Sequence, residues 1–230
     1  HLVEEFWELL KWDVQRLTQG KLTTFCHAIM GAGSPLDNVF GFVDGTVKEI
    51  TWPELNQRLY YNGHKWMHGL KYTSIIFPDG IMCLTGPFVG RYHNVSIWRM
   101  SGMEDILQKK AFDTNNRRIY VYGDPAYLSA LGVIPAYRGY LTQAVQEFNT
   151  AMVKIRIAVE WGFAKVCSQW AHLDFAPNLK TGLSPVGLYY IVAVLFSNCH
   201  TCIYGHQVLE KFMLDPPSLE EYLYVPADAV

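Results

Sequence analysis

Apolar residues recur at two different spacings along the chain, and each spacing predicts one type of element. An apolar residue every three or four positions predicts helix over residues 1–32, 96–110, 142–168 and 183–195. Apolar or β-rich runs between turn residues predict strands over residues 39–43, 70–77, 81–84 and 118–122. Pro78-Asp79-Gly80 lies between two of these runs and predicts a hairpin. Hairpin and helices together predict an α/β fold with a mixed sheet.

This pattern divides the chain into three segments. A helical segment covers residues 1–32, an α/β domain covers 33–204, and a tail packed on that domain covers 205–230, with a break at Pro216-Pro217. The chain begins at His1 rather than Met, so we expect a fragment of a longer protein. The longest apolar run, residues 188–196, is too short to cross a bilayer, so we expect no membrane partner.

Composition and charge narrow the classes of protein that fit. Half of the residues are hydrophobic and 17% are charged, which predicts a folded domain with a sizeable core. The net charge is -2, whereas domains that hold DNA alone are often strongly basic. This balance argues modestly against tight DNA binding by the chain alone, but not against a nuclease whose acids await metal. The five cysteines, an odd number in apolar surroundings, predict reduced thiols and an intracellular location.

Two aspartates follow predicted strands directly, and a glutamate lies in the longest predicted helix. Asp44 precedes Gly45, Asp124 precedes Pro125, and Glu160 adjoins an apolar position of the helix over residues 142–168. Carboxylates at strand ends emerge at the rim of a sheet, where ligands bind. Three carboxylates that meet there repel one another unless a cation is present, and Mg2+ prefers oxygen ligands. Each acid alone also fits a plainer role, as a turn residue or a solvated helix position.

Several basic and aromatic residues are candidates for contact with nucleic acid. Lys65, Lys71, Arg91, His93 and His64 can line a DNA groove, and ordinary surface positions are the alternative. Arg156, one helical turn before Glu160, can orient that glutamate, touch a phosphate or form a simple ion pair. Trp66 and Trp98 can stack on bases or pack in the core.

Three blocks around the acids resemble the signature blocks of PIF/Harbinger-type transposases, which belong to the DDE endonuclease superfamily. Residues 42–46 read Phe-Val-Asp-Gly-Thr, residues 122–127 read Tyr-Gly-Asp-Pro-Ala-Tyr, and residues 156–161 read Arg-Ile-Ala-Val-Glu-Trp. Between Asp124 and Glu160 lie 35 residues, 125 to 159, a spacing similar to the family's common pattern. Further ordered blocks, among them Gly90-Arg91-Tyr92-His93, extend the resemblance over residues 28–224.

The resemblance implies a fold, an activity and partners. It implies an RNase H-like mixed five-stranded sheet flanked by helices, with Asp44 ending the first strand, Asp124 the fourth, and Glu160 on a later helix. It implies cleavage of DNA phosphodiester bonds, and strand transfer, by a two-metal mechanism with Mg2+, for which Mn2+ can substitute. Transposon-end DNA, a Myb-like DNA-binding protein and a second copy of the chain are the implied partners, and the nucleus is the implied location.

Two departures from the family pattern keep a second function open. Asn94 stands where many relatives carry an aspartate, and only a short helical stretch precedes Asp44, where relatives often carry a helix-turn-helix region. The alternative is a decayed, domesticated relative that serves as a DNA- or protein-binding scaffold.

Two other chemistries are weaker candidates. Cys199, Cys202 and His206 suggest zinc, but a single Cys-x-x-Cys pair is a weak signal. Residues 43–46 also resemble a phosphatase of the haloacid dehalogenase type, but Phe42 stands where that family has its nucleophilic aspartate.

Overall fold

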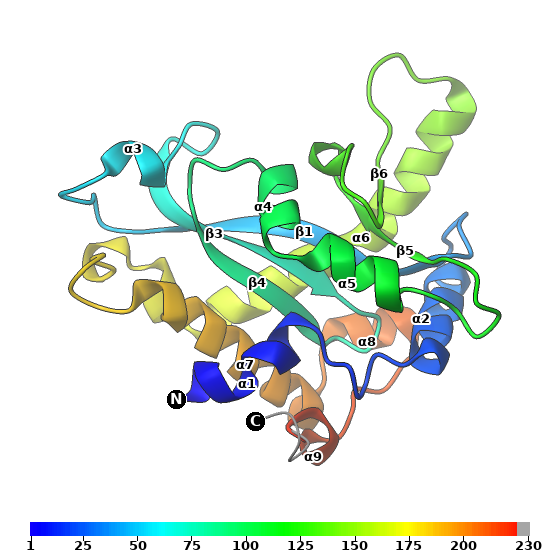
Figure 1. Cartoon of the computed structure of the whole chain (residues 1–230). Coiled ribbons are helices and arrows are strands. Elements are labelled where there is room, and N and C mark those ends of the chain that lie inside the picture. Colours follow the sequence, from blue (N-terminus) through cyan, green and yellow to red (C-terminus); the bar gives the residue numbers. More distant parts are fainter. Residues whose placement is uncertain (225–230) are drawn as a thin grey trace.

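A curled mixed sheet forms the centre of the molecule (Figure 1). The structure is a computed structural model and describes residues 1–224. Its strands are β1 (Val39–Glu49), β2 (Tyr61–Asn62), β3 (Met67–Ile76), β4 (Met82–Val89), β5 (Tyr120–Gly123) and β6 (Val133–Pro135). Five of them lie in the order β4-β3-β1-β5-β6, and the short β2 adds to β3. The pairs β1–β3 and β3–β4 are antiparallel, whereas β1–β5 and β5–β6 are parallel. The predicted mixed, RNase H-like sheet is therefore confirmed.

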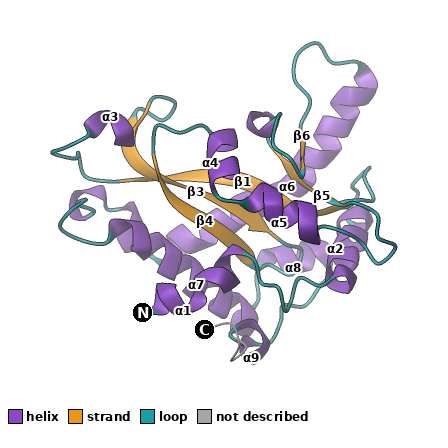
Figure 2. Cartoon of the chain, viewed as in Figure 1, coloured by secondary structure: helices purple, strands orange, loops and turns teal. Residues whose placement is uncertain are grey.

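Helices cover both faces of this sheet (Figure 2). They are α1 (Leu2–Lys11), α2 (Gln19–Gly31), α3 (Gln57–Tyr60), α4 (Asn94–Met100), α5 (Met103–Lys110), α6 (Gln143–Gln169), α7 (Val186–Tyr204), α8 (Gln207–Phe212) and α9 (Leu219–Tyr222). Short 3-10 turns lie at Pro125–Tyr127, Ala171–Asp174 and Ala176–Asn178. Buried side chains of α6 and α7 belong to one core cluster, and those of α4 and α5 belong to a second.

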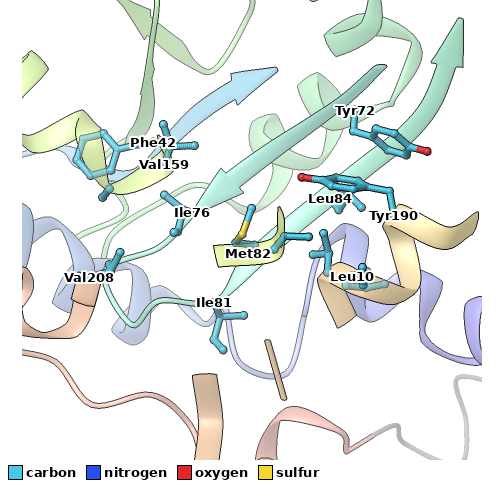
Figure 3. Packing of buried hydrophobic residues seen from close by; sticks show 14 of the residues in the cluster. Leu10, Phe42, Tyr72, Ile76, Ile81, Met82, Leu84, Val159, Tyr190 and Val208 are labelled. Carbon is cyan, nitrogen blue, oxygen red and sulfur yellow. The ribbon is translucent and has the colours of Figure 1, made fainter. Parts of the chain in front are cut away.

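The two cores follow from the alternation of side chains along β1 and β3. Phe42 and Ile76 are paired across the strands and face the α6–α7 side, where Val159 and Tyr190 also lie (Figure 3). Tyr72, on the same face of β3, packs its ring 4.6 Å from the ring of Tyr190. Successive residues of a strand point to opposite faces, so Val43, beside Phe42, and Ile75, beside Ile76, belong to the second core.

The first strand is longer than the sequence pattern predicts. The predicted strand ends at Val43, but β1 continues to Glu49 because Asp44 to Glu49 pair with Ser74 to Gly69 of β3. The expectation that Asp44 ends the first strand is therefore wrong, and Asp44 lies inside it. Backbone hydrogen bonds across the β1–β3 pair hold this polar stretch extended, which a search for apolar runs cannot detect.

Several predicted helices have different bounds. The stretch over residues 1–32 is two helices, α1 and α2, and the stretch over 96–110 is divided at Gly102, which has a left-handed φ of 73°. The long helix is confirmed with Thr142 as its N-cap residue, whereas Pro185 rather than Ser184 precedes α7. The strand β6 was not predicted, because three residues are too few to form a recognisable pattern.

Helix α7 is more than the short apolar run of the sequence. Its 19 residues are long and apolar enough to cross a membrane by length and composition, and in this structure it packs over the sheet as a core helix. Buried Asn198 is bonded to both backbone groups of Met82 in β4, accepting from its N–H at 3.0 Å and donating to its carbonyl at 2.8 Å. Asn198 therefore attaches α7 to the sheet.

The segments before and after the sheet pack onto it. Arg16, between α1 and α2, donates to Asp79 in the β3–β4 turn at 2.6 Å, and it also pairs with Asp13. In the tail, Phe212 and Tyr222 are buried, and Pro216-Pro217 separates α8 from α9 as the sequence predicts. The last residues of the predicted tail, 225–230, lie outside the described residues.

Candidate active site

Two of the candidate acids lie at the same level of two neighbouring parallel strands. Val43 of β1 is paired with Gly123, the last residue of β5, so Asp44 within β1 and Asp124 directly after β5 are each the next residue along the chain. Asp124 leaves its strand at once, because Pro125 begins a 3-10 turn, and its Oδ1 accepts a hydrogen bond from the N–H of Ala126 at 2.9 Å. The resemblance placed Asp124 at the end of the fourth strand, and Asp124 directly follows β5, which is the fourth strand when the two-residue β2 is left out.

The third acid is joined to Asp44 through an arginine. Arg156 of α6 donates from Nη1 to Asp44 Oδ2 at 2.9 Å and from Nη2 to Glu160 Oε1 at 3.2 Å. The spacing of Arg156 and Glu160 places them one turn apart on the same face of α6. The sequence indicated their ion pair, but the bond from Arg156 to Asp44, across 112 positions of chain, was not predicted.

The electrostatic environment of Asp44 favours an added positive charge. Burial raises the pKa of Asp44 above its usual value, and the charge of Asp124 raises it further, whereas Arg156 and the N–H of Gly45 lower it. Burial outweighs the favourable contacts, because a carboxylate removed from water loses more than one partly exposed arginine restores. The ionised form of Asp44 therefore costs free energy in the folded protein.

The positions of the three acids decide whether they form a set of metal ligands. Within residues 1–224, no three His, Cys, Asp or Glu side chains are close enough together to hold one ion, and the guanidinium of Arg156 lies between Asp44 and Glu160. The chemistry of the acids suits a divalent cation, because such ions take carboxylate oxygens and a desolvated aspartate beside a second aspartate attracts positive charge, although the three side chains do not converge on one point.

Two buried hydroxyl groups belong to the same neighbourhood. The side chains of Tyr127 and Thr73 are buried, and their oxygens have no hydrogen-bond partner. Burial, and then the charge of Asp44, raises the pKa of Tyr127 well above its usual value, so its hydroxyl keeps its proton. Tyr127 therefore supplies a neutral hydrogen-bond donor near the two aspartates. No sequence pattern singled it out, although it ends the block of residues 122–127.

Lys71 and Asn94 form a polar contact on the opposite face of β1. Lys71 is buried, and its Nζ donates to the carbonyl of Tyr92 and to Oδ1 of Asn94, both at 2.8 Å. A Cβ added to Gly45 would lie 3.2 Å from the Asn94 amide, so Asn94 packs directly beside the strand that carries Asp44. Lys71 thus fixes the loop before α4, whereas the sequence suggested a residue exposed along a groove.

The other basic candidates are exposed. Lys65, Arg91 and His93 all lie at the surface, on the β2–β3 turn and on the loop between β4 and α4. Asn62 connects these two segments, since its Nδ2 donates to the carbonyl of Gly90 at 2.8 Å. The structure therefore brings Lys65 and Arg91 to neighbouring loops, and it places Arg156 apart from them, at the acids.

Replacing Lys71 with methionine is expected to loosen the loop of residues 90–94. Hydrogen bonds from a charged group contribute roughly 1.5–3 kcal/mol, so their loss should raise amide exchange in this loop by about tenfold or more. Hydrogen-exchange mass spectrometry of the variant and the wild type measures this. Lys65→Met, which removes an exposed lysine, is the matched control. Unchanged exchange in Lys71→Met would contradict the assigned role.

The zinc interpretation gains no support from the geometry. Among the residues that the structure describes, no metal-binding cluster includes Cys199 or Cys202. Burial raises the pKa of Cys202 to about 12, which keeps the thiol protonated. His206 instead caps α8, because its Nδ1 accepts the N–H of Val208 at 3.0 Å.

The fold and the acids define the class of the chain: an RNase H-like domain with one acid in β1, one directly after the parallel neighbour β5, and one on a facing helix. The sequence profile of the DDE superfamily endonuclease family matches residues 43–197, which is 155 of the 230 residues and includes all three acids. The chain belongs to this family. No curated protein and no solved structure matches the chain.

Proposed function

We propose that the chain cleaves DNA phosphodiester bonds, and joins strands, as a transposase of the PIF/Harbinger type. The observation that carries the proposal is the position of Asp44 in β1 beside Asp124, which directly follows the adjacent β5, with Glu160 tied to Asp44 through Arg156. Membership of the DDE superfamily endonuclease family supports a nuclease activity. The PIF/Harbinger subgroup rests on the sequence blocks around the three acids.

Each residue of the site has a role in this proposal. Asp44, Asp124 and Glu160 provide carboxylate oxygens for two Mg2+ ions, or for Mn2+ in their place. Such ions, when bound, activate water and stabilise the leaving oxygen of an in-line displacement. Arg156 offsets part of the charge of Asp44 and Glu160, and its remaining N–H donors are available to a DNA phosphate. Tyr127 keeps a proton near the aspartates.

The DNA and the partners form part of the same proposal. Lys65, Arg91 and His93 would contact the DNA backbone from exposed loops, and Lys71 would hold one of these loops in place. The net charge of -2 leaves little general attraction for DNA, so a Myb-like DNA-binding partner and a second copy of the chain would supply the remaining affinity. Activity on transposon ends would take place in the nucleus, after synthesis in the cytoplasm.

A nicking assay with matched protein preparations tests the activity. Supercoiled plasmid is incubated with the chain in Mg2+, in Mn2+ or with a chelator, and Asp124→Ala is purified and assayed in parallel. We expect nicking by the wild type only when metal is present, and none above background by the variant. Equal nicking by wild type and variant would assign the activity to a contaminant and contradict the proposal.

A second function is favoured by two observations. Arg156 already supplies a positive charge to Asp44 and Glu160, so these acids have a partner without a metal ion. Asn94 is neutral where many relatives carry an acid. Both features suit a domesticated scaffold that keeps the fold and binds DNA or protein without cleaving it. Titration calorimetry distinguishes the two functions: heat of Mn2+ binding that disappears in Asp124→Ala supports the nuclease, and its absence in the wild type supports the scaffold.

A further inference from the structure

Trp66 is an exposed aromatic residue at the tip of the turn between β2 and β3. Its side chain is 82% exposed, although tryptophan is among the residues that gain most from burial. Its backbone has a left-handed φ of 58°, a conformation that glycine adopts at lower cost. The turn therefore displays a large ring to solvent at an energetic disadvantage, and such costs are found where a surface binds something.

The turn that displays Trp66 is held by hydrogen bonds. Buried Asn62 accepts from the N–H of His64 at 3.1 Å and from the N–H of Lys65 at 2.9 Å. The carbonyl of Asn62 accepts from the N–H of Trp66 at 2.8 Å, which closes the turn. These contacts fix the backbone on both sides of the ring, so little order is lost when the ring stacks on a partner.

A continuous set of contacts connects this turn to the strand of Asp44. Asn62 donates to the carbonyl of Gly90, and Lys71 donates to the carbonyl of Tyr92 and to Asn94. Asn94 packs against Gly45, the residue after Asp44. The loop of residues 90–93 is thereby held at both ends, between the Trp66 turn and the acidic site.

The residues around Trp66 are of the types that bind an unpaired nucleotide. His64 and Lys65 precede the ring and are exposed, and Arg91 is exposed on the loop that Asn62 joins to this turn. Cations beside an exposed aromatic ring are the combination that binds single-stranded nucleic acid, with the cations on phosphates and the ring on a base. Trp98, the other candidate from the sequence, is 1% exposed and donates to the carbonyl of Leu131, so it is a core residue.

We propose that Trp66 stacks on an unpaired DNA base at a fixed distance from the cleaved bond. Ser74 is paired with Asp44, and Met67 begins β3 seven residues earlier, so the Trp66 turn lies about 23 Å from the acids along the strand. At about 3.4 Å per nucleotide, this separation corresponds to roughly seven nucleotides. Figure 1 shows the β2–β3 turn at the end of β3 that lies beside α3. The inference rests on the proposed action on DNA.

The experiment compares two DNA probes and three variants. Fluorescence anisotropy measures the affinity of the full chain for a labelled duplex, either fully paired or with four unpaired nucleotides in the middle. The wild type should prefer the unpaired probe, and Trp66→Ala should weaken binding of that probe by about tenfold while changing the paired probe little. Trp66→Phe keeps a ring and should retain most of the preference. Tyr224→Ala removes another exposed aromatic ring, after α9, and should have no effect.

The outcomes separate this inference from the proposed function. Equal affinities of Trp66→Ala and the wild type for the unpaired probe, with both proteins folded by circular dichroism, would overturn the stacking role and leave the nuclease untouched. An equal loss on both probes would also overturn it, since that result indicates general contact rather than stacking. A wild type that binds neither probe would remove both proposals together.

The distance is measured separately. Duplexes that carry a single unpaired 2-aminopurine, placed at successive positions from the nicked bond, report stacking on Trp66 through quenching of their fluorescence. We expect the strongest Trp66-dependent quenching about seven nucleotides from that bond. Quenching that is independent of Trp66, or that is strongest next to the bond, would contradict the assigned position.

Discussion

Replacing Asp79 with asparagine should lower the free energy of unfolding by about 3 kcal/mol, one of the largest effects expected from a single substitution in this chain. Asp79 is fully buried, and both of its oxygens accept: Oδ2 from Arg16 at 2.6 Å and Oδ1 from the N–H of Ile81 at 3.3 Å. An asparagine amide has one acceptor and one donor group. Whichever way it turns, a donor faces a donor.

The consequence reaches beyond the β3–β4 turn, because Arg16 belongs to the segment between α1 and α2. Its guanidinium also pairs with Asp13 and lies over the ring of Phe77. The Nη2 atom of Arg16 is already buried without an acceptor, so no nearby acceptor can replace Asp79. Weakening the bond to Asp79 should therefore loosen the N-terminal helices as well as the hairpin.

Thermal unfolding of the variant measures this effect. For a chain of this length, about 3 kcal/mol corresponds to a fall in Tm of roughly 6–12 °C. Asp37→Asn is the matched control, because Asp37 pairs with Arg117 at 2.8 Å but is 60% exposed. An exposed ion pair contributes little, so this control should change Tm by no more than about 2 °C. Similar shifts in the two variants would show that burial does not govern the pair.

The parts of the site that the sequence predicted are those set by local pattern. Asp124 was placed correctly because a β-rich run before Gly123 and Pro125 marks the end of a strand. The long helix was recognised from its apolar spacing, which placed Arg156 and Glu160 on one face. The mixed sheet followed from the order of hairpin and helices.

The parts that were missed depend on pairing between distant segments. The extension of β1 past Asp44 follows from backbone bonds to β3, and the bond from Arg156 to Asp44 follows from how α6 lies on the sheet. Lys71 was expected on the surface because lysines are almost never fully buried without a partner. Its burial depends on Tyr92 and Asn94, whose positions no local pattern shows.

The negative charge of Asp44 serves the proposed function but lowers the stability of the fold. Its carboxylate is desolvated and lies beside Asp124, so its pKa is raised in the folded protein. An acid with a higher pKa in the folded than in the unfolded state binds protons more readily when folded. Its stabilising effect is therefore greatest below the unfolded pKa and is lost as pH rises through the folded pKa. At pH 7 the ionised side chain costs stability, which the proposed function explains, because a cation-binding site needs that charge.

Replacing Asp44 with asparagine should separate these two demands. A metal ion contributes several kcal/mol of charge stabilisation to the transition state, and losing one of its carboxylate ligands should lower the rate of DNA nicking by about 10³-fold. Both oxygens of Asp44 accept, from Gly45 and from Arg156, but Asp44 is 21% exposed, so water can satisfy the donor that an amide leaves unpaired, unlike at buried Asp79. Tm at pH 7 should therefore stay the same or rise, because the costly charge is gone while Arg156 keeps Glu160. Asp105→Asn, at an exposed position of α5, is the control and should change neither. Loss of nicking together with a lower Tm would mean that Asp44 supports the fold rather than the chemistry.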